Sequence, residues 1–277
     1  MSNNRETTLQ ALRDRATQVR RGLWRALHAA GSGHVGGSSS AADLLAALYF
    51  HHLNIRSDEP NWPGRDRFVL SKGHGNAALV AVLAEAGFFS VDQLDTFYGF
   101  QSLLGMHPDI KAPGIEMSTG ALGHGLSVGV GMALGARIQD VDFRTVVMIG
   151  DGELQEGSNW EGAMAAAQMG LSNLTAIIDF NKIQQGGRIE EAIGLEPLAD
   201  KWRAFGWSVR EIDGHDMGAI VDAFDDLPFA ADAPSLLIAH TIKGKGVSFA
   251  EDTWTWHNNM VTDEVYAKAL EELGGAE

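Results

Sequence analysis

The amino-acid sequence predicts an α/β fold, a doubly wound and mainly parallel sheet with helices on both faces, formed as a single domain by residues 1–277. Short apolar, β-rich runs alternate along the chain with longer Ala-rich or amphipathic stretches, as strands and helices do in βαβ units. Loops rich in Gly, Ser and His follow several of the apolar runs, as expected where strand ends gather at one edge of a sheet. With 45% hydrophobic residues, the chain can bury one large core.

The composition narrows the class of protein. The formal charge is 21 − 36 = −15, from 21 Lys and Arg against 36 Asp and Glu, which argues against a nucleic-acid or anionic-membrane surface. The absence of cysteine excludes disulfides, thiolate zinc sites and cysteine nucleophiles. No apolar run approaches membrane-spanning length, and the polar N-terminus does not resemble a signal peptide. We therefore expect a cytoplasmic protein with no nucleic-acid or membrane partner.

The N-terminal part of the sequence predicts helices joined by loops rich in glycine and histidine. In order, we expect a charged amphipathic helix over residues 8–30, a glycine-rich loop over 31–37, an apolar helix over 40–50, a turn-rich stretch over 54–65 and a short strand over 67–70. The motif SKGHG and an Ala-rich helix follow that strand. Further loops carry the motif GMHP at 105–108 and residues 118–125, which open a helix rich in Gly and Ala.

The middle of the chain predicts one complete βαβ unit. Residues 145–149 and 174–178 are apolar and β-rich and indicate buried strands, and the Ala-rich residues 158–169 between them indicate a helix. Parallel strands end at the same edge of a sheet. Asp151, in the run GDGELQEG after the first strand, should therefore lie beside Asn181, which follows the second.

The C-terminal part of the chain predicts the rest of the sheet. We expect a helix over residues 198–205, a strand over 207–212, a last buried strand over 236–240 and a helix over 263–273. The last strand leads into the motif KGKG at 243–246, and His257 lies in the polar loop beyond it. The sequence shows neither internal repeats nor an interdomain linker, which favours a single domain.

The residue types around GDG suit a metal–diphosphate site. Asp151 and Asn181 carry the oxygen donors that Mg²⁺ or Ca²⁺ takes, and Mg²⁺ commonly keeps phosphate oxygens in its shell. Gly150 and Gly152 would let the backbone approach a phosphate closely, and the following helix would direct N–H groups and a partial positive charge toward it. An isolated GDG is more often a simple turn. The strand before it, the helix after it and Asn181 favour the binding site.

Eight stretches of the chain, in the same order, resemble the N-terminal, diphosphate-binding part of transketolases, which use thiamine diphosphate. They are SGHVGG, RDRFVLSKGH, GMHPD, STGALGHGLSVGVGMA, GDGELQEGSNWEGAMAA, IIDFNKI, IDGHD and TIKGKG. One such motif would be weak, but eight ordered matches from the first helix to His257 identify the chain as a member of this family. The resemblance implies the thiamine diphosphate-binding fold, in its diphosphate-binding form.

The resemblance also implies where cofactor and metal ion bind. Asp151, Asn181 and the backbone carbonyl of Ile183 would be the ligands of Mg²⁺ (or Ca²⁺). The residues expected to contact thiamine diphosphate are Gly120, Leu122, Gly150, Gly152, Glu156, Asn181 and Lys243. For Lys243, a solvated position in its loop is an equally weighted alternative to phosphate neutralisation, and the same holds for Lys245.

Four histidines fall in stretches that match the family's active-site loops: His34, His74, His107 and His257. By resemblance these are the expected catalytic residues, the first and last near the reacting carbonyl and hydroxyls and the other two along the cofactor and donor sugar. Histidine suits this work because proton movements accompany C–C cleavage near neutral pH. We expect structural roles for His28, His51, His52 and His240 and a turn-stabilising role for His215.

Two further positions match the family but allow a second interpretation, and a third departs from it. Glu156 and Glu161 match carboxylates of an acidic network near the family's dimer interface, although both also suit the solvated first turn of a helix. His124 stands where many family members carry glutamine, which leaves its role open.

The resemblance covers only the first part of a complete transketolase. The glutamate that activates the cofactor's aminopyrimidine ring lies, in the family, on a pyrimidine-binding domain that this sequence does not show. We therefore expect a split transketolase: this subunit anchors metal and diphosphate, and a separate C-terminal transketolase subunit supplies the glutamate, in a heterotetramer. The expected activity is transfer of a two-carbon ketol unit from a ketose (phosphate) to an aldose (phosphate).

Other functions stay open at this point. Within the same cofactor class, the chain could belong to a deoxyxylulose-phosphate synthase or to a transketolase-like enzyme with an unusual sugar; Glu156 after GDG favours transketolase. A non-catalytic cofactor-binding subunit is a further alternative. A histidine-rich zinc enzyme and a nucleotide-binding domain are weaker, because the chain lacks HExxH, a P-loop and a GxGxxG after its first strand.

Overall fold

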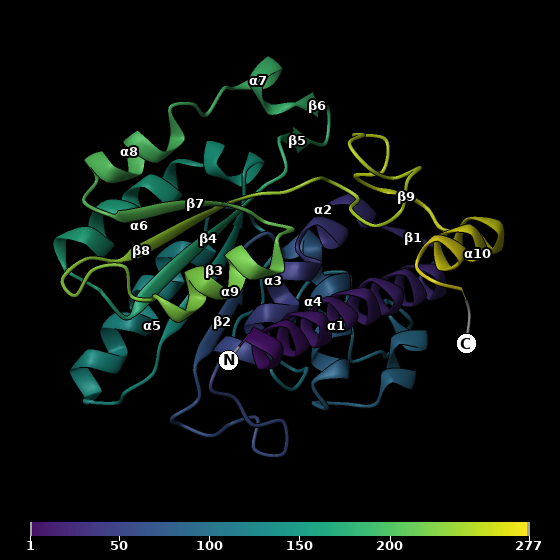
Figure 1. The fold of residues 1–277 in the computed structure, drawn as a ribbon, viewed down its shortest axis with the longest axis horizontal. Coiled ribbons are helices and arrows are strands. Elements are labelled where there is room, and N and C mark those ends of the chain that lie inside the picture. The colour runs from purple at the N-terminus through teal and green to yellow at the C-terminus, as the bar shows by residue number, and fades with distance from the viewer. Residues whose placement is uncertain (1, 276–277) are drawn as a thin grey trace.

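The computed structural model describes residues 2–275 and is built around a five-stranded parallel sheet (Figure 1). The strand order is β2-β3-β4-β8-β7, with bounds β2 Arg67–Leu70, β3 Thr145–Gly150, β4 Leu174–Phe180, β7 Ser208–Asp213 and β8 Ser235–His240. Every neighbouring pair is parallel. The predicted α/β class and parallel sheet are therefore confirmed, and each predicted strand lies within two residues of an observed one.

The central strands are buried along their whole length because both faces of the sheet are covered. All residues of β3 and β4 are buried, which explains their continuous apolar sequence. Gly150 pairs with Asp179 at the carboxyl end of these strands. The chain segments that follow β3 and β4 consequently leave the sheet side by side, as the βαβ pattern predicts.

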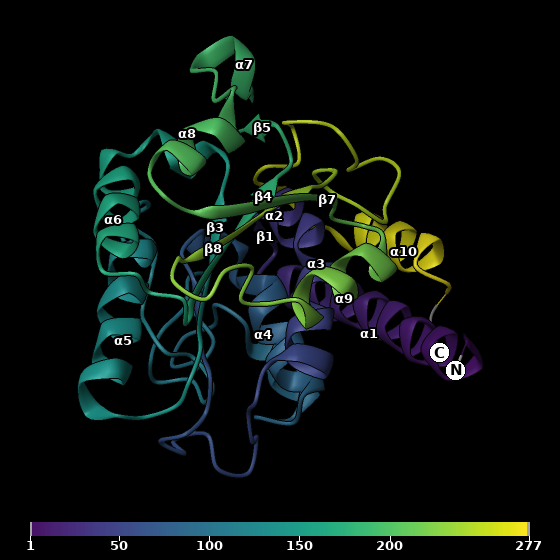
Figure 2. The ribbon, with the colours of Figure 1, turned by 60° about the vertical axis from the view of Figure 1, so that its left-hand side comes forward.

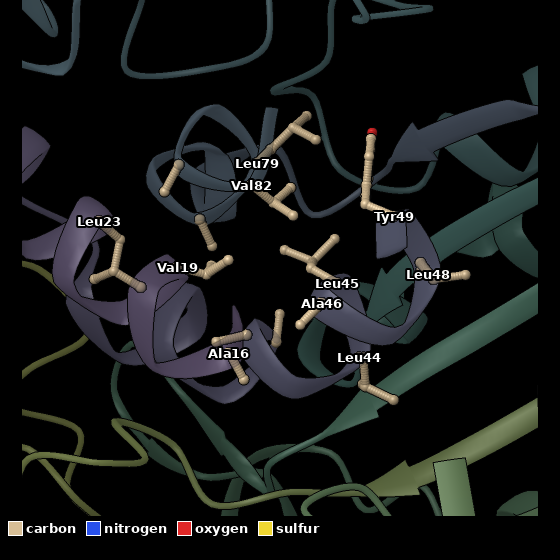
Figure 3. Close-up of a cluster of buried hydrophobic side chains, with 14 of the residues drawn as sticks. Ala16, Val19, Leu23, Leu44, Leu45, Ala46, Leu48, Tyr49, Leu79 and Val82 are labelled. Atoms are coloured by element: carbon tan, nitrogen blue, oxygen red, sulfur yellow. The ribbon is translucent and has the colours of Figure 1, made fainter. Parts of the chain in front are cut away.

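Helices lie on both faces of the sheet (Figure 2). One face carries α1 (Ser2–Ala29), α2 (Val35–Ser40), α3 (Ala42–Ala47), α4 (Asn76–Glu85) and α9 (Met217–Asp225). The other carries α5 (Gly125–Gln139), α6 (Gly157–Gln168) and α8 (Leu198–Ala204). Each set packs into its own apolar cluster. In the larger one, Val19 of α1 points toward Leu45 of α3 and Val82 of α4 (Figure 3).

Short elements complete the described chain. They are the π-helix η1 (Leu48–His52), the 3₁₀ helices η2 (Gly73–Gly75), η3 (Val91–Thr96) and η4 (Gly152–Gln155), the helices α7 (Ile189–Ala192) and α10 (Asp263–Glu272), and the two-stranded pairs β1 (Ser32–Gly33) with β9 (Asn259–Met260) and β5 (Ile183–Gln184) with β6 (Gly187–Arg188). In the described residues, no helix is both long and apolar enough to span a bilayer.

Two predicted elements differ from the structure. The expected glycine-rich loop 31–37 is already helical from Val35, and in this helix a Cβ would lie 2.8 Å from Lys243 at Gly36 and 3.2 Å from His74 at Gly37. The expected helix 40–50 is interrupted after Ser40 and ends in η1. Helix α9 was not predicted. Its sequence, MGAIVDAFD, is short, although Asp216 caps it by accepting hydrogen bonds from Gly218 and Ala219.

Candidate functional site

A cavity of about 400 Å³ lies at the carboxyl edge of the sheet, where β3, β4 and β8 end. It is lined by His34, Lys72, His74, Gly120, Leu122, Gly150, Asp151, Gly152, Glu153, Gln155, Glu156, Asn181, Ile183, Gln184, Gln185, Lys243 and His257. Every residue predicted to bind cofactor or metal is in this lining, together with three of the four predicted catalytic histidines. The structure thus brings together residues that are more than 200 positions apart in the sequence.

Asp151 is buried at the floor of the cavity. Its Oδ1 accepts a hydrogen bond from the amide of Gly152 at 2.8 Å, and its Oδ2 accepts one from the amide of Lys182. Burial and the neighbouring Asp179 carboxylate raise the pKa of Asp151 to about 7. A buried carboxylate whose ionised form is disfavoured in this way is a position that a bound cation would stabilise.

Asn181 and Ile183 place two further oxygens beside Asp151. The Asn181 side chain is buried; its Nδ2 donates to Ser40 Oγ at 3.4 Å, and its Oδ1 accepts from the amide of Ile183 at 3.2 Å. The Ile183 carbonyl accepts from Lys243 Nζ at 2.7 Å. Carboxylate, amide and carbonyl oxygens form the donor set that Mg²⁺ and Ca²⁺ prefer, so these residues fit such an ion. Residues 2–275 contain no group of three or more His, Asp or Glu side chains placed to hold a metal.

Two glycines that line the cavity, Gly120 and Gly152, have little room for a side chain. A Cβ on Gly152 would lie 3.3 Å from Gln184 Cβ, and one on Gly120, whose φ is +152°, would lie 3.3 Å from the His107 ring. The helix predicted over residues 158–169 is observed as α6, Gly157–Gln168, and a short 3₁₀ helix precedes it. Residues Gly152–Gln155 first form the 3₁₀ helix η4, capped by the Asp151 side chain, and α6 begins at Gly157.

The four predicted histidines lie close together: His34, His74 and His257 line the cavity, and His107 is exposed beside His34. The His34 ring centroid lies 5.5 Å from that of His74, 5.5 Å from that of His257 and 6.2 Å from that of His107. Burial, with the nearby His107 and Lys243, lowers the pKa of His34 to about 4, and burial and Lys243 lower the pKa of His257 to about 3. Burial and Lys72 lower the pKa of His74 as well. The rings of His34, His74 and His257 are therefore neutral at pH 7 and can each both donate and accept a hydrogen bond.

Lys243 is buried within the site, whereas Lys245 is not. Lys243 Nζ lies 2.8 Å from His257 Nδ1, and burial lowers the pKa of this lysine to about 8 despite the nearby Asp151. Lys245 is partly exposed and pairs with Glu251 at 3.5 Å. The solvated alternative therefore fits Lys245 and is wrong for the buried Lys243, for which neutralisation of a phosphate stays a prediction.

Three buried charged groups in or next to the cavity were not predicted from the sequence: Asp179, Glu153 and Lys72. The first, Asp179, is 0% exposed and accepts hydrogen bonds from Lys72, Ser40 and Thr241. Burial by itself raises the pKa of Asp179, but Lys72 and the two hydroxyls lower it below its ordinary value. The position of Asp179 at the end of a buried strand, two residues before Asn181, was the only available signal.

Glu153, the second group, was missed for a similar reason, since it looks like a solvated charge in a turn. Its carboxylate is buried and accepts from Ser71 Oγ and from the amides of Gly123 at 2.8 Å and Gly150 at 3.0 Å. Burial raises the pKa of Glu153. The Glu153 side chain therefore links the GDG turn to the loop that contains Ser71 and the loop that contains Gly123.

The remaining candidates lie at the mouth of the cavity or outside it. Glu156 lines the mouth but is exposed, and Glu161 is exposed on α6. His124 is also exposed and its Nδ1 donates to the Leu122 carbonyl at 3.0 Å. His215 is not confined to its own turn, because its ring contacts Asp43 and the amide of Ile242.

Comparison with known proteins places this site in a family. The family model described as "Transketolase, thiamine diphosphate binding domain" matches residues 13–276. An apulose-4-phosphate transketolase subunit of Phocaeicola vulgatus is 45% identical over 265 residues, which cover 96% of this chain and 94% of that protein. The 6-deoxy-6-sulfo-D-fructose transketolase subunit SqwG of a Clostridium species is 47% identical over 244 residues, covering 88% and 89%.

Solved structures show the same similarity in three dimensions. Transketolase from Campylobacter jejuni superposes with a TM-score of 0.90 at 32% identity, over 96% of this chain. The match covers 43% of that transketolase chain. This chain therefore spans less than half the length of the transketolase structure it resembles.

Proposed function

The chain belongs to the transketolase family, and from this premise we propose that it is the diphosphate- and metal-anchoring subunit of a split transketolase. In this proposal it is a transferase component: with a partner subunit it moves a two-carbon ketol unit from a ketose to an aldose. We further propose that residues 1–277 act as a single thiamine diphosphate-binding domain. The observation that carries the proposal is the convergence of the GDG turn, Asn181 and the histidine cluster at one cavity.

The cofactor would bind with its diphosphate at the floor of the cavity. Asp151, Asn181 and the Ile183 carbonyl would hold Mg²⁺ or Ca²⁺, and the ion would neutralise Asp151 and the diphosphate together. The backbone at Gly120, Leu122, Gly150 and Gly152 would approach the cofactor, and Glu156 and Lys243 would lie beside it. Bound thiamine diphosphate would supply the reactive centre for breaking and forming C–C bonds.

The chain's own residues would recognise the sugar and move protons. His34, His74, His107 and His257 offer imidazole rings, and a neutral ring donates to one hydroxyl or carbonyl oxygen while accepting from another. Burial keeps His34, His74 and His257 unprotonated at neutral pH, so each can take a proton from a sugar hydroxyl. This arrangement fits a polyhydroxylated substrate better than an apolar one.

The relatives suggest the substrate class. Their names refer to apulose 4-phosphate and to 6-deoxy-6-sulfo-D-fructose, which are sugars with an anionic group. We propose that this chain also serves a ketose that carries a terminal anion. The contacts to that anion would come largely from the partner, because Lys243 and Lys72 lie deep in the cavity and bind protein groups.

A separate partner subunit is part of the proposal. Two relatives of about this length are named as subunits, and the pyrimidine-activating glutamate expected from the family would lie on the partner. We propose a cytoplasmic heterotetramer of two such pairs. The exposed Glu156 and Glu161 would then lie at the interface, where the family has its acidic network.

Copurification and assay test this function. The tagged chain is isolated with candidate partner subunits, the complex is analysed by native mass spectrometry, and ketol transfer is measured with phosphorylated and sulfonated ketoses. We expect turnover from the complex and none from either subunit alone. Sustained turnover by this chain without a partner would contradict the split-enzyme proposal.

A further inference from the structure

A buried network of three side chains connects distant parts of the fold next to the cavity. Arg20 of α1 binds Asp43 of α3 through two hydrogen bonds, from Nη1 at 3.1 Å and from Nη2 at 2.5 Å. His215, in the loop between β7 and α9, contacts the same carboxylate through Nδ1 at 2.7 Å. Arg20 and Asp43 are both buried.

Both ends of this network hold the loop that carries Lys243. The amide of Ile242 donates to His215 Nε2 at 2.8 Å, and Arg20 Nε donates to the carbonyl of Lys245 at 2.9 Å. The residues on either side of the segment 243–244 are therefore bound by one network. A third contact, from the amide of Gly244 to the Gly36 carbonyl at 3.0 Å, holds the middle of the loop.

The geometry requires one particular form of the His215 ring. Burial alone would raise the pKa of Asp43, but Arg20 and His215 lower it to about 2, so the carboxylate is ionised and only accepts hydrogen bonds. Nδ1 of His215 must then carry a proton. Nε2 must be unprotonated, because it accepts the amide proton of Ile242.

The loop has no regular structure of its own to hold it in place. Gly244 and Gly246 have φ values of +79° and +101°, and a Cβ on Gly244 would lie 1.9 Å from the Ala250 carbonyl oxygen. Lys243 lies between the end of β8 and these glycines. Its side chain points into the cavity, where Nζ contacts the Ile183 carbonyl oxygen and His257 Nδ1. A buried ammonium group carries a desolvation cost, so an unrestrained loop would return it to water.

We propose that His215 is a positioning residue for cofactor binding, which acts through the amide of Ile242 to fix Lys243 in the cavity. The inference rests on the proposed function, since it assigns Lys243 to the cofactor site. It also gives a role to the IDGHD motif, whose histidine lies outside the cavity lining.

Two substitutions of His215 test the contacts of its two ring nitrogens separately. In His215→Gln the side-chain amide oxygen can replace Nε2 as the acceptor for Ile242, whereas in His215→Asn the amide nitrogen can replace Nδ1 as the donor to Asp43. We expect His215→Asn to weaken binding of thiamine diphosphate with Mg²⁺ by roughly tenfold, and His215→Gln to restore most of the loss. His51→Ala, which removes a surface histidine paired with Asp225 at 2.7 Å, is the matched control and should bind as the unaltered chain does.

A double-mutant cycle shows whether His215 acts through Lys243. On a Lys243→Met background, His215→Asn should have less than a twofold effect on cofactor binding. An effect of equal size with and without Lys243 would overturn the proposal, as would equal losses in the Asn and Gln variants. If the unaltered chain, alone or with its partner, bound no thiamine diphosphate, the proposed function itself would fail.

NMR of the unaltered chain provides a test that needs no folded variant. In a long-range ¹H–¹⁵N spectrum at pH 7.5, the His215 ring should show a protonated Nδ1 and an unprotonated Nε2. A ring protonated at Nε2 would overturn the proposal whatever the binding data show, because it could not accept from Ile242.

Discussion

At the residue scale, the site contains buried charged side chains, of which some are paired with each other and one, Asp151, has no cationic side chain bonded to it in the described residues. Lys72 neutralises Asp179 through a buried ion pair, 1% and 0% exposed, which leaves Asp151 as the buried carboxylate available to a cation. Asp151 and Asn181 could be predicted from the sequence because each directly follows a buried strand, where parallel sheets bind ligands. Lys72, Glu153 and Asp179 could not, since only the tertiary fold shows that these charges are buried.

Removing one partner of the Lys72–Asp179 pair should be costly. Lys72→Met leaves Asp179 uncompensated in the core, and we expect the free energy of unfolding to fall by about 3–5 kcal/mol. In the double variant Lys72→Met/Asp179→Asn most of that loss should be regained. Urea denaturation measures both changes in the free energy of unfolding.

The exposed ion pair between Lys268 and Glu264 provides the control. Lys268→Met should change the free energy of unfolding by about 0.5 kcal/mol or less. A loss as large as that of Lys72→Met would show that burial is not what makes the Lys72–Asp179 pair important.

From the lowered pKa values of His34 and His257 we predict that the free energy of unfolding depends on pH. Because the folded-state pKa of His34 is about 4 and that of His257 about 3, the unfolded chain, with values near 6.5, binds protons that the folded chain does not. Stability should therefore fall as the pH drops from about 6.5 toward 4, with no contribution from these groups above that range. Unfolding measured across this interval should show a shallower fall in a His34→Gln/His257→Gln variant. An equally steep fall would show that these rings are not the cause.

At the element scale, helix α5 illustrates how glycine sets the distance between a helix and the sheet. A Cβ on Gly129 would lie 2.4 Å from Val147 Cγ2 of β3, whereas one on Gly131, two residues later, would meet nothing within 4 Å. The sequence predicted a helix rich in small residues here, but not which glycine faces β3. Likewise, η1 and the early start of α2 depend on packing that no local pattern reveals.

The two glycines should therefore respond oppositely to alanine. Gly131→Ala should stabilise the chain by up to about 1 kcal/mol, because alanine has the higher helix propensity. Gly129→Ala gains the same propensity but overpacks against the sheet, which typically costs about 1–3 kcal/mol, so we expect net destabilisation. Thermal and urea unfolding of both variants measure the difference. Equal effects at the two positions would contradict the packing described for α5.

At the scale of the whole molecule, the fold explains how one chain gathers the residues of the proposed cofactor site at a single edge of its sheet. The parallel sheet and its helical layers follow from the alternating pattern of the sequence, and the loops at its carboxyl edge form the cavity. The position of His257 against His34, although they are 223 residues apart (257 − 34), follows only from the complete fold. What the family resemblance adds to the geometry is the identity of the ligand.

Binding of thiamine diphosphate to the purified chain, measured by calorimetric titration with and without Mg²⁺, tests the cofactor-anchoring role most directly. We predict one saturable site that requires both the metal and the diphosphate group, and that is weakened by about 100-fold or more in Asp151→Ala. Asp142→Ala alters an exposed carboxylate near the opposite end of β3 and should bind normally. Metal-independent binding, or unchanged affinity in Asp151→Ala, would contradict this role.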